Sequence, residues 1–214
     1  MKPLSFEQDY FRKAYGNDYA RRNPVRRLDY YLTRIRELRP SGSLLDVGCA
    51  YGLFLSRARW FYNVTGCDVS EHAVGVAKER FPDLDIFHAG IGDLPSGRIF
   101  DIVTAFDVLE HVADPLRAMA ELSRHLGEGG VLALTIPVYD GLPGWIARLL
   151  DRDDTHLRKE NRRFWREAVT SAGFDIVLDE GLWRYLVPGL GYLFFGGRAW
   201  RDFSPALLLI GVKR

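Results

Sequence analysis

Short apolar runs alternate with amphipathic stretches along most of this chain. The first apolar run ends in Asp46, a loop bounded by two glycines follows, and apolar residues resume at Leu53. This pattern predicts a buried strand, a tight turn and the start of a helix. We expect further strands at 64–69, 85–89, 100–106, 130–136, 174–179 and 206–212, with helices at 53–61, 71–81, 115–126 and 160–172. Alternating strands and helices indicate a parallel sheet covered on both faces.

The first 40 residues precede this pattern and are basic, with ten lysines and arginines against five acids. Apolar residues recur there at helical spacing: Leu28, Tyr31, Leu32, Ile35 and Leu38. This spacing predicts an amphipathic helix that ends before Pro40. Two interpretations stay open: a docking helix with a solvated basic face, or a lid over a ligand site whose arginines meet an anionic substrate.

Composition changes this picture little. The chain has 214 residues, of which 47% are hydrophobic and 27% charged, and its net charge is +1. These values are typical of a soluble globular protein and do not favour nucleic acid as a partner. Two cysteines, Cys49 and Cys67, cannot build a disulfide framework or a metal site by themselves. No apolar run is long enough to span a bilayer and the N-terminus lacks a signal-peptide core, so we expect a cytoplasmic protein.

The glycine-bounded loop carries the first chemical signal. Its spacing is Asp46-x-Gly48-x-x-x-Gly52, which differs from the Gly-x-Gly-x-x-Gly of dinucleotide-binding domains. Asp46 would repel a phosphate but suits a ligand that carries an ammonium group. Asp68 follows Gly48 by 20 residues, the spacing at which a second strand brings a carboxylate to a bound ribose. A nicotinamide-dependent oxidoreductase is the less favoured alternative.

Four segments, in this order, resemble the motifs of class I S-adenosylmethionine-dependent methyltransferases, in the branch that modifies small molecules, quinones and sugars. They are 44–52, 66–70, 100–112 and 126–132. One departure is Ala50, where the family usually has glycine. The resemblance implies a Rossmann-like, seven-stranded, mostly parallel sheet with helices on both faces and an antiparallel final strand. It also implies a domain over 41–214, preceded by an N-terminal helical lid segment and interrupted by insertions near 138–158 and 180–203.

The resemblance also assigns residues to S-adenosylmethionine and its product S-adenosylhomocysteine. The implied cofactor-binding residues are Asp46, Gly48, Cys49, Gly52, Asp68, Val69, Asp93, Leu94 and Phe106. Asp46 and the loop backbone would hold the cationic amino-acid end, and Asp68 would accept hydrogen bonds from the ribose hydroxyls. Val69, Asp93 and Leu94 would surround the adenine. Phe106 would lie near the sulfonium, where an aromatic face favours a cation.

The acceptor side offers a candidate catalytic group of Glu110, His111 and His156. Either histidine could remove a proton, because the pKa of histidine lies near neutrality. With Asp107, the same residues could instead hold a divalent metal ion, as in small-RNA 2′-O-methyltransferases, although a metal is not favoured. Asp107, Glu110 and His111 would then share one face of a short helix.

The two insertions are expected to shape the acceptor pocket. The first carries an apolar helix around Trp145, and the second is rich in aromatic residues, including Tyr192 and Phe194. We expect methyl transfer to a small or lipid-linked acceptor, at oxygen in the favoured version, with contact at a membrane surface as a further expectation. The alternatives are transfer to nitrogen or carbon, and a non-catalytic S-adenosylmethionine-binding protein that acts through its aromatic insertion.

Overall fold

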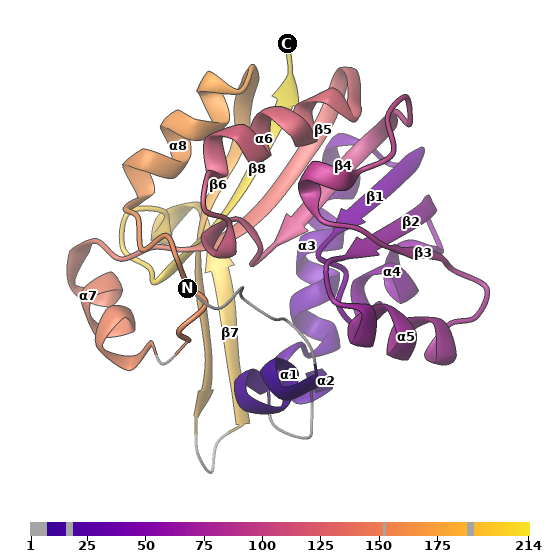
Figure 1. The fold of residues 1–214 in the computed structure, drawn as a ribbon. Coiled ribbons are helices and arrows are strands. Elements are labelled where there is room, and N and C mark those ends of the chain that lie inside the picture. The colour runs from indigo at the N-terminus through magenta and orange to yellow at the C-terminus, as the bar shows by residue number, and fades with distance from the viewer. Residues whose placement is uncertain (1–7, 16–18, 152, 188–190) are drawn as a thin grey trace.

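The computed structural model describes residues 8–15, 19–151, 153–187 and 191–214, which form one eight-stranded sheet with helices on both faces (Figure 1). The strands are β1 (Ser43–Val47), β2 (Asn63–Asp68), β3 (Asp85–His88), β4 (Phe100–Phe106), β5 (Leu126–Pro137), β6 (Phe174–Val187), β7 (Gly191–Gly197) and β8 (Ala206–Lys213). Their order in the sheet is β3-β2-β1-β4-β5-β8-β6-β7. Strands β1 to β5 pair in parallel, and β8 runs antiparallel to both β5 and β6.

The predicted α/β architecture is therefore confirmed, including the antiparallel final strand, but the count of seven strands is wrong. The eighth strand, β7, lies inside the segment expected to be an insertion. β6 continues past Asp179 to Val187, and β7 returns along it from Gly191, which has a φ of 90°. Positive φ is accessible to glycine at little cost, so the chain can begin its return there.

Eight α-helices surround the sheet among the described residues: α1 (Gln8–Tyr15), α2 (Tyr19–Arg22), α3 (Val25–Leu38), α4 (Leu53–Ala58), α5 (Glu71–Arg80), α6 (Pro115–Arg124), α7 (Gly141–Leu150) and α8 (Arg162–Ser171). Short 3₁₀ turns span Ile91–Asp93, Leu109–His111 and Arg198–Trp200. Ser70 and Asp114 cap α5 and α6 by accepting backbone N–H groups, which satisfies donors that a helix start leaves open. No helix among the described residues is long and apolar enough to cross a membrane.

Two cores lie on opposite faces of the sheet. Helices α6 and α8 cover one face, where Met119, Leu122 and Trp165 are fully buried. Helices α3 and α4 cover the other face, which carries the predicted apolar stripe of α3. Leu28, Tyr31, Leu32 and Ile35 are buried as expected, whereas Leu38 is 40% exposed because it lies in the last turn. Figure 1 shows α1 and α2 at the lower end of the sheet as drawn.

Candidate active site

The loop between β1 and α4 is held tightly against the end of β2. Gly48 and Gly52 have φ values of 74° and 72°, in the left-handed region that favours glycine. A Cβ atom on Gly48 would lie 2.4 Å from Cγ2 of Val108, so no larger residue fits there. The N–H groups of Gly48 and Cys49 both donate to the carbonyl of Cys67, at 2.8 and 3.0 Å.

Two buried carboxyl groups lie at the adjacent carboxyl ends of β1 and β2. Asp46 accepts a hydrogen bond of 2.6 Å from Oγ1 of Thr104 and is 3% exposed. Burial raises the pKa of Asp46 to about 7, against the hydrogen bond from Thr104 and with a further rise from the charge of Asp68. Asp68 accepts from the N–H groups of Ala50 and Ser70, at 2.8 and 2.9 Å. Burial raises the pKa of Asp68 as well, although both backbone hydrogen bonds oppose the rise.

The remaining predicted cofactor residues lie along the same edge of the sheet. Val69 follows β2 and is 51% exposed, while Leu94 is buried after the 3₁₀ turn that carries the exposed Asp93. Phe106 ends β4 and packs between Tyr31 and Phe54, at ring-centroid distances of 4.9 and 5.0 Å.

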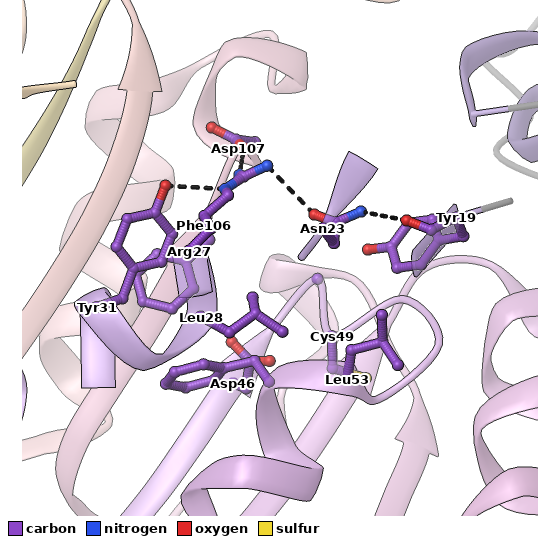
Figure 2. Close-up of a pocket in the computed structure, with 12 residues that line it drawn as sticks. Tyr19, Asn23, Arg27, Leu28, Tyr31, Asp46, Cys49, Leu53, Phe106 and Asp107 are labelled. Atoms are coloured by element: carbon purple, nitrogen blue, oxygen red, sulfur yellow. Dashed lines mark hydrogen bonds and ion pairs between the residues drawn. The ribbon is translucent and has the colours of Figure 1, made fainter. Parts of the chain in front are cut away.

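A pocket opens between α3, the glycine loop and the end of β4 (Figure 2). Its lining residues include Asp46, Gly48, Cys49, Phe106, Asp107, Arg27, Tyr31 and Asn23. Figure 2 shows Arg27 reaching across the pocket toward Asp107, Tyr31 and Asn23. One pocket therefore has carboxyl groups and a guanidinium in its walls, which suits a ligand that bears both an ammonium and a carboxylate.

Asp107 is the centre of a charge cluster that is largely, but not fully, buried. Its Oδ2 accepts from the guanidinium groups of both Arg27 and Arg184, and its Oδ1 accepts from Oγ1 of Thr135 at 2.9 Å. Burial alone would raise its pKa, but the charges of Arg184 and Arg27 hold the pKa of Asp107 well below its usual range. Arg27 also donates to Tyr31 Oη at 2.9 Å and to Asn23 Oδ1 and Tyr192 Oη at 3.3 Å.

The three predicted catalytic residues do come together. Ligand atoms of Glu110, His111 and His156 all lie within 4.8 Å of one another. Glu110 is 1% exposed, and its Oε2 has no hydrogen-bond partner among the described residues. Burial raises the pKa of Glu110 to about 8, helped by the charge of Asp107. Burial lowers the pKa of His111, so its imidazole is neutral at pH 7.

Neighbouring residues orient both histidines. Nδ1 of His156 lies 2.9 Å from Oδ2 of Asp151, and Nδ1 of His111 lies 3.1 Å from the carbonyl of Thr155. Because both partners are acceptors, each Nδ1 carries a hydrogen and each neutral ring keeps its lone pair on Nε2. Tyr139 donates to the same carboxylate of Asp151, at 2.8 Å.

Glu110, His111 and His156 could supply three ligands of a divalent metal ion. If the histidines bound it through Nε2, Asp151 and Thr155 would stand in the supporting positions typical of such sites. Asp107, which we expected as a fourth ligand, does not belong to this group. Its carboxylate is used by two arginines and Thr135, and it precedes the 3₁₀ turn Leu109–His111 rather than sharing a helix face with it. Its φ of 58° turns the chain between the strand and that turn.

Helix α1 contacts both sides of the site. Phe11 stacks on Tyr51 of the glycine loop, with ring centroids 4.8 Å apart. Tyr10 donates to Asp153 at 3.3 Å, and Lys13 pairs with Asp154 at 2.6 Å. The helix thus joins the cofactor loop to the segment that carries His156.

Sequence reasoning did not single out Arg27, Tyr139, Asp151 or Arg184 as site residues. Arg27 was one of ten N-terminal cations, and 80 residues separate it from Asp107. The one available signal was Asp107 itself, because an acid that follows a buried strand needs a donor partner.

A family model described as a methyltransferase domain matches residues 18–179. A probable S-adenosylmethionine-dependent methyltransferase of Mycolicibacterium smegmatis is 28% identical over 81% of this chain and 66% of its own length. A ubiquinone biosynthesis O-methyltransferase of Xanthomonas campestris is 34% identical over 64% of this chain and 62% of its own length. The chain therefore spans less than two thirds of the length of these relatives.

Among solved structures, one of an S-adenosylmethionine-dependent methyltransferase from Thermotoga maritima, named as a possible histamine N-methyltransferase, superposes with a TM-score of 0.73. It is 18% identical, and the match covers 96% of this chain and 98% of that one. At this identity the likeness shows the fold alone. The match to the family model spans well over half of the sequence. The chain belongs to the methyltransferase-domain family and has the fold of class I S-adenosylmethionine-dependent methyltransferases.

Proposed function

We propose that this protein transfers a methyl group from S-adenosylmethionine to the oxygen of a small or lipid-linked acceptor. The observation that carries the proposal is the pocket between β1, β4 and α3, with buried acids and a guanidinium in its walls and two oriented histidines beyond Asp107. S-adenosylmethionine, when bound, supplies a methyl group already activated by the sulfonium, so the protein needs only to align the acceptor and remove its proton.

For the cofactor, the charges of the pocket walls suggest its orientation. Asp46 would receive the ammonium group, and Arg27, across the same pocket, would receive the carboxylate. Asp68 retains oxygen lone pairs for the ribose hydroxyls beyond its two backbone hydrogen bonds. Val69, Asp93 and Leu94 would enclose the adenine along the same edge.

For proton removal, we favour His156 as the general base. Its Nδ1 is held by Asp151, which would stabilise the imidazolium that forms when Nε2 takes a proton. His111 is the second candidate, because burial keeps it neutral. Glu110 would then serve to position the histidines.

A metal-assisted version is the alternative within the same chemistry. Glu110, His111 and His156 would be its protein ligands. A divalent ion there would lower the pKa of an acceptor hydroxyl.

Two observations suggest the class of acceptor: the names of relatives and the exposed surface of helix α7. Relatives named as ubiquinone biosynthesis O-methyltransferases favour an oxygen acceptor and a quinone-like ring. Helix α7 lies in the chain between Tyr139 and Asp151 of the cluster, and its Leu142, Trp145, Ile146 and Leu149 are 42–64% exposed. This apolar surface suits a lipid-linked acceptor and contact with a membrane surface. The wall expected from Tyr192 has support in its contact with Arg27, whereas Phe194 is buried against Tyr30 and Tyr31.

The test follows methyl transfer from S-adenosylmethionine labelled in its methyl group, with catechol, phenol and amine acceptors offered in parallel. Labelled ethers support the proposal, and labelled amines would shift it to nitrogen. Cofactor binding without transfer to any acceptor favours the non-catalytic alternative. Activity that a chelator abolishes and a divalent ion restores selects the metal version over the histidine base.

A further inference from the structure

Arg184 is a largely buried cation that the proposed chemistry does not yet use. It lies on β6, on the face that also carries Glu180 and Leu182, since alternate residues of a strand share a face. This face packs against α3, where Tyr30 donates to Glu180 at 2.6 Å. The side chain of Arg184 is 13% exposed and its Nη1 donates to Asp107.

The charges around Asp107 do not balance. Two guanidinium groups share one carboxylate, so the cluster carries a surplus positive charge. The side chains of Arg27, Arg184 and Asp107 are 9%, 13% and 23% exposed, and a surplus charge that is largely shielded from water is costly unless an anion pairs with it.

The two arginines differ in how their donors are used. Arg27 bonds to Asp107, Tyr31, Asn23 and Tyr192. For Arg184, Asp107 is the single hydrogen-bond acceptor in the part of the chain that the structure describes. A guanidinium has five N–H donors in a flat fork, so most of those on Arg184 remain for a ligand.

Arg184 also adjoins the pocket, because Asp107, to which it donates, is one of the pocket's lining residues. Its charge acts on Tyr31 at the pocket wall, and it acts on Glu110 and Tyr139 in the cluster beyond. Under the proposed function the acceptor has to meet the cofactor on one side and the base on the other, so it would come close to Arg184.

We propose that Arg184 binds a carboxylate carried by the methyl acceptor, so that the protein selects acidic acceptors over their neutral counterparts. This inference rests on the proposed methyl transfer. A carboxylate matches the planar fork of the guanidinium through two parallel hydrogen bonds. It would neutralise the surplus charge of the Arg27–Asp107–Arg184 cluster and fix the distance between the acid and the hydroxyl that is methylated.

Calorimetry on the S-adenosylhomocysteine complex tests the proposal with two matched pairs: 3,4-dihydroxybenzoate with its amide, and 4-hydroxyphenylacetate with its amide. The wild type should bind at least one acid roughly 10–100-fold more tightly than its amide, the range expected for lost charge-assisted hydrogen bonds. Arg184→Gln should bring this ratio to about one, and Arg184→Lys, which keeps the charge but loses the fork, should fall between. Arg198→Gln, at an exposed arginine of the turn after β7, should match the wild type.

Equal binding of acid and amide in both pairs, or an unchanged ratio in a folded Arg184→Gln variant, overturns the inference. The cofactor is the other source of a carboxylate. If Arg184→Gln weakens S-adenosylhomocysteine but not its decarboxylated analogue, Arg184 serves the cofactor and the inference is wrong. If the wild type does not bind S-adenosylhomocysteine at all, the proposed function is refuted. If the preference for the acid is lost only in the Arg184 variants, Arg184 is identified as the anion site independently of methyl transfer.

Discussion

The two ends of the site are built differently. At the cofactor end, Asp46 and Asp68 lie on neighbouring parallel strands, and backbone groups or one threonine hold them in place. At the acceptor end, side chains from α3 and β6 hold Asp107, and the side chain of Asp151, after α7, holds His156. Backbone hydrogen bonds therefore fix the first end, and side-chain networks fix the second.

This difference affects which substitutions each end of the site can accept. The cofactor end depends on glycines at positive φ and on a close contact between Gly48 and Val108, so few substitutions fit. The acceptor end depends instead on side-chain pairs such as Arg27–Asp107 and Asp151–His156. Variants at the two ends should accordingly separate binding of the cofactor from use of the acceptor.

The largest effect is expected at the acceptor end. His156→Ala should lower methyl transfer by roughly 10²–10⁴-fold, the usual contribution of a general base, while S-adenosylhomocysteine binds as before. The measurement is the initial rate with labelled cofactor together with calorimetry. His125→Asn is the control, because His125 lies before β5 at the opposite edge of the sheet and uses Nδ1 for a carbonyl. If His156→Ala loses cofactor affinity instead, the two ends are not separable.

The next largest effect is expected at Glu110, on the pH dependence of the free energy of unfolding. Its pKa is raised by burial to about 8, against about 4.3 in an unfolded chain, so the folded protein holds a proton that the unfolded chain releases. This group therefore lowers stability as pH rises from about 4.3 to 8, by roughly 1.4 kcal/mol per pH unit, and its effect is constant above that window.

Glu110→Gln cannot titrate, so the variant should gain stability relative to the wild type between pH 6 and pH 8, by about 2–3 kcal/mol. Denaturant unfolding at both pH values measures the difference. Glu121→Gln, at a partly exposed position of helix α6, is the control. A difference that does not change with pH would mean that Glu110 is ionised in the folded protein.

At the cofactor end, Asp68→Asn should weaken S-adenosylhomocysteine by about 1.5–3 kcal/mol, the value of a hydrogen bond to a charged group. The acceptor Michaelis constant should be unchanged once the cofactor is saturating. Calorimetry measures the affinity, and Asp85→Asn, at the amino end of β3, is the matched control. Unchanged affinity in the Asp68 variant would remove this residue from the cofactor site.

The smallest effect is expected at α7. Leu149 is 64% exposed and Trp145 is 57% exposed, so replacing either with serine should change the unfolding free energy by no more than about 0.5 kcal/mol. Partition into phosphatidylglycerol vesicles should fall in the same variants if the acceptor is lipid-linked. A loss of stability above 1 kcal/mol would show instead that this helix packs on the domain.

The sequence predicts the fold and the cofactor end better than the acceptor end, for a physical reason. The strands and the buried stripe of α3 follow from local periodicity, and the acids at the ends of β1 and β2 follow from strand spacing. The link between Arg27 and Asp107 spans 80 residues and leaves no local pattern. The eighth strand was missed because glycines and Pro188 around 187–191 suggested an irregular insertion, while pairing with β6 stabilises a strand at 191–197.

The left-handed backbone of Asp107 restricts which residues can set the net charge of the Arg27–Asp107–Arg184 cluster. Aspartate and asparagine tolerate a φ of 58°, whereas bulky or branched residues are strained there. A single change to asparagine would keep the turn and the shape of the side chain while doubling the surplus positive charge beside the acceptor. Replacing one oxygen of Asp107 by an amide nitrogen could thus alter which acceptors bind, while the backbone of the fold stays the same.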